Sequence, residues 1–198
     1  MKIKFQYNKT SLQRLKKQLA IRERALPTLK NKESALRVEV KNAKDQAGHL
    51  DKKLREKMQA YEHMVQLWSE FKPELIHICD VKTSSKKIAG VQTPILEDIS
   101  FTNKPFSIFN NPKWYLDGIN ILQDLARVSI ERKFFIRKMQ LLDHARKKTT
   151  QKVNLYEKVQ IPGFQDAIRK INRFLEDEEN LSKSSQKIVK SRKEKAAL

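Results

Sequence analysis

The residue types that bind metal ions or act as nucleophiles are few and widely separated in this chain. The histidines are His49, His63, His77 and His144, and the single cysteine is Cys79. A zinc site needs ligands at short, regular spacings, such as a helical HExxH pair, and the histidines show no such spacing. Cys79 stands in a strand-like stretch without a local histidine signature, so we expect a buried structural cysteine and not a nucleophile. The sequence therefore predicts no metal site.

Groups that bind phosphate or carry out acid–base catalysis are also missing from recognisable patterns. The chain has four glycines, at positions 48, 90, 118 and 163, and no GxxxxGK[ST] sequence, so a glycine-rich phosphate loop cannot form. The carboxylates at positions 176–179 follow one another on a predicted helix, and such a run usually forms a solvated face. We predict no catalytic residue, no cofactor and hence no enzymatic activity.

The strongest bulk feature is charge, because 42 Lys and Arg residues oppose 23 Asp and Glu residues and give a net charge of +19. Such an excess commonly indicates a polyanionic partner, for example nucleic acid or an anionic membrane face. The basic residues are spread along the whole chain, however, and aromatic residues at spacings suited to base stacking are absent. We therefore do not expect nucleic acid binding. An acidic protein cavity suits the basic surface equally well.

The sequence also indicates a compartment. With one cysteine the chain cannot form an internal disulfide, and no apolar run approaches the roughly 18 residues of a membrane span. The N-terminal residues MKIKFQYNKT lack the apolar core of a signal peptide. We expect a cytoplasmic protein that does not insert into a membrane.

A heptad pattern of apolar residues runs through residues 1–72. Steps of three and four residues from Leu12 reach eighteen positions, of which only Arg22, Glu33 and Lys57 are polar. An apolar stripe of this period predicts one long helix in a left-handed coiled coil. The apolar positions are Leu12, Leu15, Leu19, Leu26, Leu29, Leu36, Val40, Ala43, Ala47, Leu50, Leu54, Tyr61, Met64, Trp68 and Phe71.

A second stripe of the same period lies in residues 112–198 and supplies a partner for the first. Asn111 and Pro112 are suited to the N-cap and the first turn of this helix. We predict a mainly α fold in which the N-terminal and C-terminal helices of one chain form an antiparallel two-helix coiled coil. A homodimer through the first helix is the alternative. The positions of the second stripe are Ile121, Leu125, Val128, Arg132, Phe135, Met139, Leu142, Arg146, Thr149, Val153 and Tyr156.

Residues 73–111, between the two helices, have a different composition. IHICDV alternates apolar and polar residues at Ile76 and Ile78, KTSSKK has the composition of a turn, and IAGVQTPILEDISF is rich in β-branched residues. Gly90 and Pro94 interrupt this last stretch. We predict a small β-hairpin with an irregular tail that caps the coiled coil where the chain turns round.

The apolar stripe changes phase within residues 153–171. A strict heptad after Tyr156 continues to Gln160 and Gly163, whereas the next bulky apolar residues are Phe164 and Ile168. The eleven residues from Val153 to Phe164 indicate a stutter that locally unwinds the supercoil, and Pro162 and Gly163 lie at this point. Pro162 removes the hydrogen bond to the Lys158 carbonyl and creates a joint in the helix. Two separate helices joined by an ordinary turn are the alternative.

Three segments of the chain resemble the D subunits of V-type and archaeal-type rotary ATPases, with the bacterial branch most similar. The first is KTSLQRLKKQLAIRERALPTLKNKESAL, with Leu29, Lys30 and Lys32 in a basic Leu-Lys-x-Lys segment, and the second is KIAGVQTPILE, with a Gly-Val-x-x-Pro pattern. The third is TTQKVNLYEKVQIPGFQDAIRKINRFLEDEEN. Its residues that match the family signature are Val153, Asn154, Glu157, Ile161, Pro162 and Gly163.

The resemblance implies a central rotor shaft without catalysis of its own, part of a membrane-bound complex. Its partners would be the catalytic and regulatory subunits of the ATPase hexamer, the F subunit, and the subunit that links the shaft to the membrane ring. The helix termini, with Arg14, Arg22, Lys187 and Lys190, would face the hexamer. The hairpin, with Ile76, Ile78 and Val91, would contact the other subunits. A free-standing basic coiled-coil adaptor or nucleic-acid-binding scaffold is the alternative that composition alone leaves open.

Overall fold

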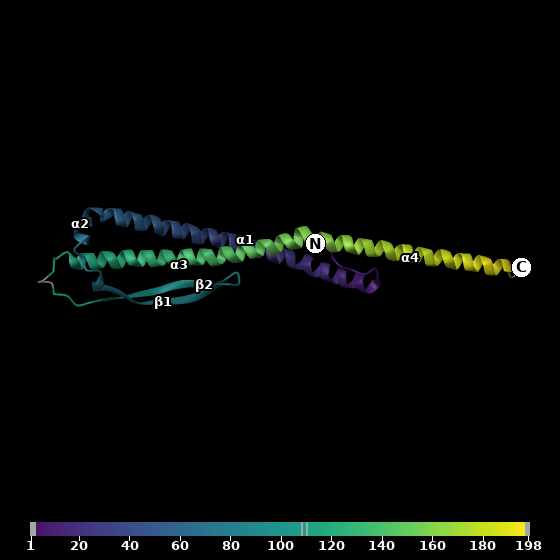
Figure 1. Ribbon diagram of the computed structural model, residues 1–198, viewed down its shortest axis with the longest axis horizontal. Helices are drawn as coiled ribbons and strands as arrows, with labels where there is room; N and C mark the ends of the chain where they lie inside the picture. Colours follow the sequence, from purple (N-terminus) through teal and green to yellow (C-terminus); the bar gives the residue numbers. More distant parts are fainter. Residues whose placement is uncertain (1–2, 108, 110, 197–198) are drawn as a thin grey trace. The chain divides into compact units, whose positions relative to one another are not determined.

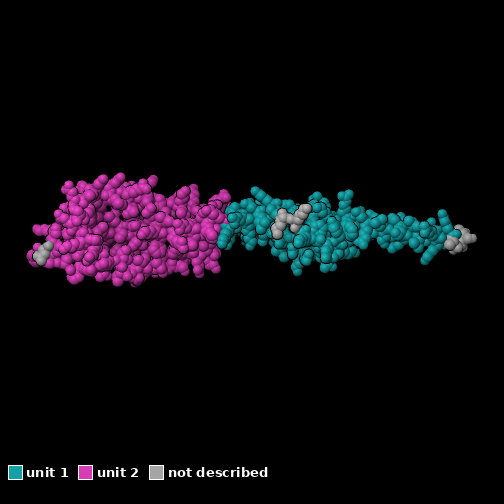
Figure 2. All heavy atoms as spheres, viewed as in Figure 1, with its two compact units in different colours: residues 1–32, 148–198 teal, residues 33–147 magenta. Residues whose placement is uncertain are grey.

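The computed structural model describes residues 3–107, 109 and 111–196 of the 198-residue chain. The described residues form two compact units, which Figure 2 shows in different colours. One unit contains residues 1–32 and 148–198, and the other contains residues 33–147. The predicted ranges 1–72, 73–111 and 112–198 also include residues 1–2, 108, 110 and 197–198, which lie outside the described residues.

Long helices dominate the chain at both ends, with two strands between them (Figure 1). The first long helix ends at Ala60 and not at residue 72, and two short helical turns follow it before the hairpin. In chain order the elements are α1 (Lys9–Ala60), η1 (Glu62–Met64), α2 (Val65–Trp68), η2 (Pro73–Leu75), β1 (Ile76–Ile88), β2 (Val91–Asn103), α3 (Tyr115–Asn154), η4 (Leu155–Gln160) and α4 (Ile161–Ala196).

The predicted coiled-coil seam is confirmed by burial. All eighteen heptad positions of the first stripe, and all eleven of the second, are buried or half-buried. The last four positions of the first stripe lie beyond the end of α1 and are buried or half-buried outside the long helix; they are Tyr61, Met64, Trp68 and Phe71. The pairing is antiparallel in each unit: in residues 33–147, Lys57 Nζ lies 3.3 Å from Asp124 Oδ2 and Arg132 Nε lies 2.9 Å from Asp51 Oδ1. The chain therefore covers its own apolar stripe, as predicted, and a second copy is not needed for that purpose.

The hairpin turns at a different place from the one predicted. KTSSKK lies inside β1, and the turn is formed by Ala89 and Gly90, with φ angles of 47° and 83°. In a two-residue hairpin loop of type I′ both central residues have positive φ, which matches the twist of the strands, and glycine adopts it without strain. The polar residues of KTSSKK reflect a strand of which much of the surface meets solvent. Polarity alone therefore misplaced the turn.

The hairpin packs along α3 (Figure 1). Thr93 on β2 is fully buried and its hydroxyl donates to the Lys86 carbonyl across the hairpin. Gln123 of α3 donates to the Asn103 side chain at 2.9 Å. Cys79 is the extra residue at a β-bulge and is exposed, which corrects the expected buried cysteine. A bulge leaves its residue out of the regular pairing, so the strand pattern does not report its burial.

An aromatic cluster forms where α3 begins. Phe71, Leu75, Tyr115 and Ile119 are its buried members, and Trp114 packs beside them. The Tyr115 amide donates to the Pro112 carbonyl in a turn, so α3 starts at Tyr115 and Asn111 does not cap it as predicted. The physical reason is that the turn from Pro112 to Tyr115 comes before the first helical hydrogen bond, which the Gly118 amide donates to the Trp114 carbonyl.

Two features of the fold bear on function. No helix in the described part of the chain is long and apolar enough to cross a membrane. Among the same residues, no group of three or more His, Cys, Asp or Glu side chains is placed to hold a metal ion.

Truncation of one seam residue tests the coiled coil. Leu36 is fully buried and Val38, on the same helix, is 55% exposed. We expect Leu36→Ala to lower the free energy of unfolding by about 2–5 kcal/mol, because it removes buried methyl groups and leaves a cavity. Val38→Ala is the matched control and is expected to change it by less than about 0.5 kcal/mol. Urea unfolding followed by circular dichroism measures both, and equal effects would contradict the seam.

Candidate functional site

The phase change predicted near Pro162 is a π-helical segment inside one continuous helix. η4 (Leu155–Gln160) joins α3 to α4, and the flanking residues Asn154 and Ile161 both have right-handed helical dihedral angles. The Ile161 amide donates to the Tyr156 carbonyl, five residues earlier. The alternative of two helices joined by an ordinary turn is therefore wrong. π-helical turns are rare and often mark functional positions.

A single extra residue in the heptad pattern explains this segment. Thr149 and Tyr156 are seven residues apart, Phe164 follows after eight, and Ile171 follows after seven more. All four are buried or half-buried, so the seam stays on one side of the helix across the extra residue. A π-helical turn holds roughly one residue more than an α-helical turn. The wide turn therefore absorbs the extra residue and leaves the seam in phase on both sides.

Pro162 fixes where the wide turn ends. Proline has no N–H, and in a regular α-helix its ring clashes with the carbonyl of residue i−4, which here belongs to Lys158. Ile161 donates to Tyr156, so neither Ile161 nor Pro162 supplies a donor to the Glu157 carbonyl. Glu157 is exposed, and water can satisfy this group. The proline is thus tolerated because the regular hydrogen-bond pattern is already interrupted at this point.

Two basic residues of α1 hold η4. Arg22 Nε donates to Gln160 Oε1 at 2.6 Å, and Lys30 Nζ lies 2.7 Å from Glu157 Oε1. We call these four side chains the clasp. It brings together residues more than a hundred positions apart in the sequence, and it joins Lys30 of the first family-like segment to Glu157 of the third.

Arg22 makes the larger contribution to the clasp. Its guanidinium also donates to the Gln18 carbonyl at 3.0 Å and lies 4.6 Å from the Phe164 ring centroid and 5.9 Å from that of Tyr156. The Lys30–Glu157 pair is about half exposed, with side-chain exposures of 47% and 44%, and such pairs contribute roughly 0–1 kcal/mol. Arg22 is half-buried, so solvent screens its contacts less.

The N-terminal residues 3–7, which we call the strap, fold back on α4. Ile3 and Phe5 pack against the cluster formed by Leu15, Phe164, Ala167 and Ile171. The Tyr7 and Phe174 rings lie 4.9 Å apart. Asn8 then caps α1, because its Oδ1 accepts a hydrogen bond from the Ser11 amide at 2.6 Å. A Cβ atom on Gly163 would lie 3.1 Å from Ile3 Cδ1, so the glycine gives the strap room.

No segment within the described residues covers the last part of α4. Every residue from 176 to 195 is exposed, including Leu181, Ile188 and Val189. Phe174, Leu181 and Ile188 are each seven residues apart and therefore follow one face of the helix. A hydrogen bond from Lys183 holds the pKa of Glu179 below its usual value. This stretch is a free helical end with a narrow apolar stripe among charged residues.

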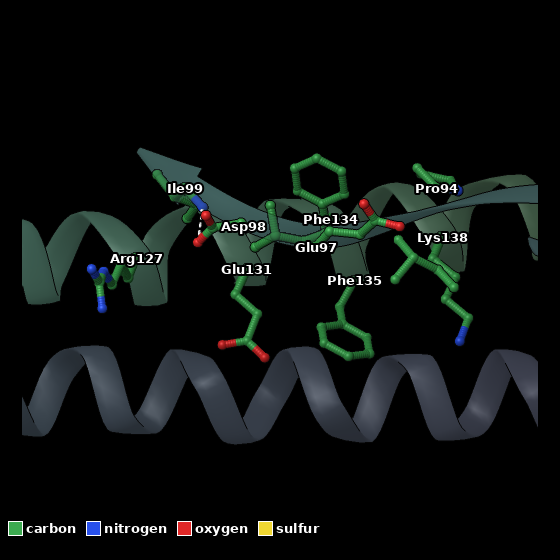
Figure 3. Close-up of a pocket in the computed structure, with 11 residues that line it drawn as sticks. Pro94, Glu97, Asp98, Ile99, Arg127, Glu131, Phe134, Phe135 and Lys138 are labelled. Carbon is green, nitrogen blue, oxygen red and sulfur yellow. Dashed lines mark hydrogen bonds between the residues drawn. The ribbon is translucent and has the colours of Figure 1, made fainter. Parts of the chain in front are cut away.

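A separate pocket of about 460 Å³ lies between β2 and α3, within residues 33–147 (Figure 3). Phe134 and Phe135 point in opposite directions from α3. Four of the five charged side chains that line the pocket are exposed, so solvent screens their charges. The charged residues are Glu97, Asp98, Arg127, Glu131 and Lys138.

The predicted contact residues occupy different surroundings. Arg14, Lys187 and Lys190 are exposed, whereas Arg22 is occupied by the clasp. On the hairpin, Ile78 is exposed, and Ile76 and Val91 are half-buried. Of the signature residues, Val153 is buried in the seam, Asn154 ends α3, Glu157 belongs to the clasp, Ile161 and Pro162 begin α4, and Gly163 faces Ile3.

Gln160 and the strap were not predicted from the sequence. Gln160 does stand at a heptad position, opposite the polar seam residue Arg22, and this coincidence of two polar seam residues was a usable signal. Residues 3–7 show no periodic pattern from which the strap could have been predicted. As a whole, the site sets the rotational alignment of the C-terminal helix against α1.

The chain is similar to known proteins over nearly its whole length. A family model described as the D subunit of ATP synthase matches residues 11–191, which include nearly all of the three family-like segments. The V-type ATP synthase D subunit of Borreliella burgdorferi is 32% identical over 193 residues, covering 95% of this chain and 94% of the relative. Its counterpart in Chlamydia pneumoniae is 26% identical over 185 residues, covering 89% and 87%, and that of Chlamydia muridarum is 25% identical over 197 residues, covering 97% of each.

Substitution of Gly163 tests the strap. Alanine favours a helix interior over glycine by up to about 1 kcal/mol, but here its Cβ must displace Ile3. We expect Gly163→Ala to raise the free energy of unfolding more in an Ile3→Ala background than in the parent chain. Thermal unfolding of the two single variants and the double variant measures the difference. Equal gains in both backgrounds would show that the strap does not rest on Gly163.

Proposed function

Because the chain belongs to the family of ATP synthase D subunits, we propose that it is the central rotor shaft of a V-type rotary ATPase. In this role it transmits rotation between the ATP-hydrolysing hexamer and the ion-translocating membrane ring. The observation that carries the proposal is the seam: two helices of one chain pair antiparallel in both units, and the predicted heptad positions are covered inside the chain. The family match over residues 11–191 leaves the free-standing adaptor without support.

The proposed mechanism requires no chemistry from this chain. ATP hydrolysis closes one catalytic interface of the hexamer after another, and the asymmetric coil turns to follow the closures. During synthesis the direction reverses. A shaft needs helices that resist twisting, which a continuous seam provides, and it needs an exterior that does not adhere strongly to its surroundings. The chain acts as a non-catalytic subunit, peripheral to the membrane on its cytoplasmic face.

The exposed end of α4 is the proposed contact with the catalytic and regulatory subunits. Lys187 and Lys190 lie there among Leu181, Ile188 and Val189. Exposed lysines bind acidic loops weakly and with strong salt dependence, which suits contacts that form and break on every turn. The apolar residues add short-range contact without a large adhesive patch. Arg14 adds an exposed positive charge on α1.

The hairpin is the proposed contact with the remaining subunits. Ile78 is half exposed on β1, and the pocket between β2 and α3 offers an apolar recess in the same unit. The F subunit, together with the subunit that links the shaft to the membrane ring, is the proposed partner of this region.

Reconstitution with the catalytic hexamer tests this function. The parent chain, together with the F subunit, is expected to bind the hexamer and to restore coupled ATP turnover. Failure to bind or to restore turnover would contradict the assignment. The double substitution Lys187→Gln and Lys190→Gln is expected to weaken binding by several fold at low salt, because it removes two charges from the proposed contact. Lys44→Gln with Lys52→Gln, on the exposed surface of α1, is the matched control of equal charge and should bind as the parent does.

A further inference from the structure

We propose that Arg22 is a positioning residue that fixes the twist of the shaft, because it holds the extra residue of the heptad pattern within η4. This inference rests on the proposed function. The helix must accommodate one residue too many somewhere near Tyr156, and the seam alone does not determine where. A wide turn can move along a helix by exchanging one hydrogen bond at a time. Something must therefore keep it between Asn154 and Ile161, where it is found.

Pro162 limits the wide turn on one side only. A wide turn shifted beyond Pro162 would return the proline to a regular α-helix, where its ring clashes with the preceding turn. Toward the N-terminus no proline opposes a shift, since α3 contains none. Contacts from α1 restrain it on that side, and Lys30–Glu157 is too exposed to supply much of this restraint.

Arg22 makes contacts that depend on the position of the extra residue. It bonds to Gln160 and lies over the rings of Tyr156 and Phe164. Tyr156 and Gln160 belong to η4, and Phe164 lies just beyond its end. If the wide turn moved toward the N-terminus past Tyr156, that residue would turn by about 100° relative to Phe164, because each residue of an α-helix advances the phase by this angle. Arg22 could then no longer contact both rings and Gln160, so its contact set selects one position of the wide turn.

Loss of this selection would let the wide turn migrate toward the N-terminus. The residues between its old and new positions would then turn about the helix axis by about 100°, and their side chains would leave the seam. In a shaft, such migration loosens the pairing of the two helices and wastes part of each step of rotation. Arg22 thus acts through η4, and its effect should appear in the coupling of rotation to hydrolysis more than in hydrolysis itself.

The first test uses the isolated full chain. Deletion of Val159 restores an unbroken heptad in which Ile161 takes the seam position of Gln160, and Pro162→Ala removes the proline from the resulting α-helix. In the Pro162→Ala chain, which keeps the extra residue, Arg22→Leu should lower the melting temperature by several degrees. In the chain that also lacks Val159, Arg22→Leu should leave it unchanged or raise it, because leucine then faces isoleucine. The same loss in both backgrounds would overturn the proposal.

A second measurement does not depend on the deletion folding. Arg22→Lys keeps the charge but loses the Nε hydrogen bond and the planar contact with the rings. Amide hydrogen exchange at Val159, Gln160 and Ile161 should become roughly tenfold faster in this variant. Lys57→Leu changes the other basic seam residue of α1, which pairs with Asp124 on α3, and should leave these three amides unchanged. Unchanged exchange in Arg22→Lys, or equal acceleration in Lys57→Leu, would overturn the proposal.

The third test measures coupling in the reconstituted complex. A bead attached to the F subunit, which turns with the shaft in the proposed complex, reports rotation and leaves the hairpin unmodified. Arg22→Lys should hydrolyse ATP at the parent rate with fewer bead turns per ATP, and the deletion chain with Pro162→Ala and Arg22→Leu should recover the parent ratio. An unchanged ratio in Arg22→Lys would overturn the inference. If the parent chain itself drives no rotation, the proposed function fails instead, while the exchange and melting results still report on Arg22.

Discussion

The structure depends on one constraint, which is that a single long apolar stripe must be covered along its whole length. A helix as long as α1 with one apolar face is unstable in water unless a partner removes that face from solvent. Here the partner is the C-terminal helix of the same chain, and none of the predicted heptad positions of the two stripes is exposed. Covalent connection through the hairpin makes the pairing independent of protein concentration.

The polar residues that interrupt the apolar stripe determine the register of the two helices. Leucines along a uniform seam can exchange partners at little cost, whereas a charge on the seam needs one particular partner. Across the helix pair, Lys57 forms an ion pair with Asp124, Arg132 forms one with Asp51, and Arg22 donates a hydrogen bond to Gln160. These contacts add modest stability, but a shift of either helix by one heptad would separate them all. They therefore specify how the two helices align.

Much of this arrangement could be predicted from the sequence because periodicity directly reflects burial. The seam, the antiparallel partner and the phase change near Pro162 all follow from apolar spacing. The hairpin turn could not be placed in the same way, since it depends on positive φ at Ala89 and Gly90 and not on polarity. The start of α3 depends on an aromatic cluster assembled from both sides of the hairpin, including Phe71 and Tyr115. Such contacts join distant segments, so the residue pattern within one segment cannot predict them.

The candidate site, too, could be predicted from the sequence only in part. The extra residue was visible in the sequence, but its accommodation by a π-helical turn was not, because a stutter can also be absorbed by gradual unwinding of the supercoil. Pro162 and Gly163 decide between these outcomes. In a regular α-helix the pair would cost roughly 4 kcal/mol, since the proline and glycine penalties add. Where the hydrogen-bond pattern is already broken, the proline loses little further bonding, and the glycine accommodates Ile3. Two residues that disfavour a helix therefore mark the position at which this helix must change phase.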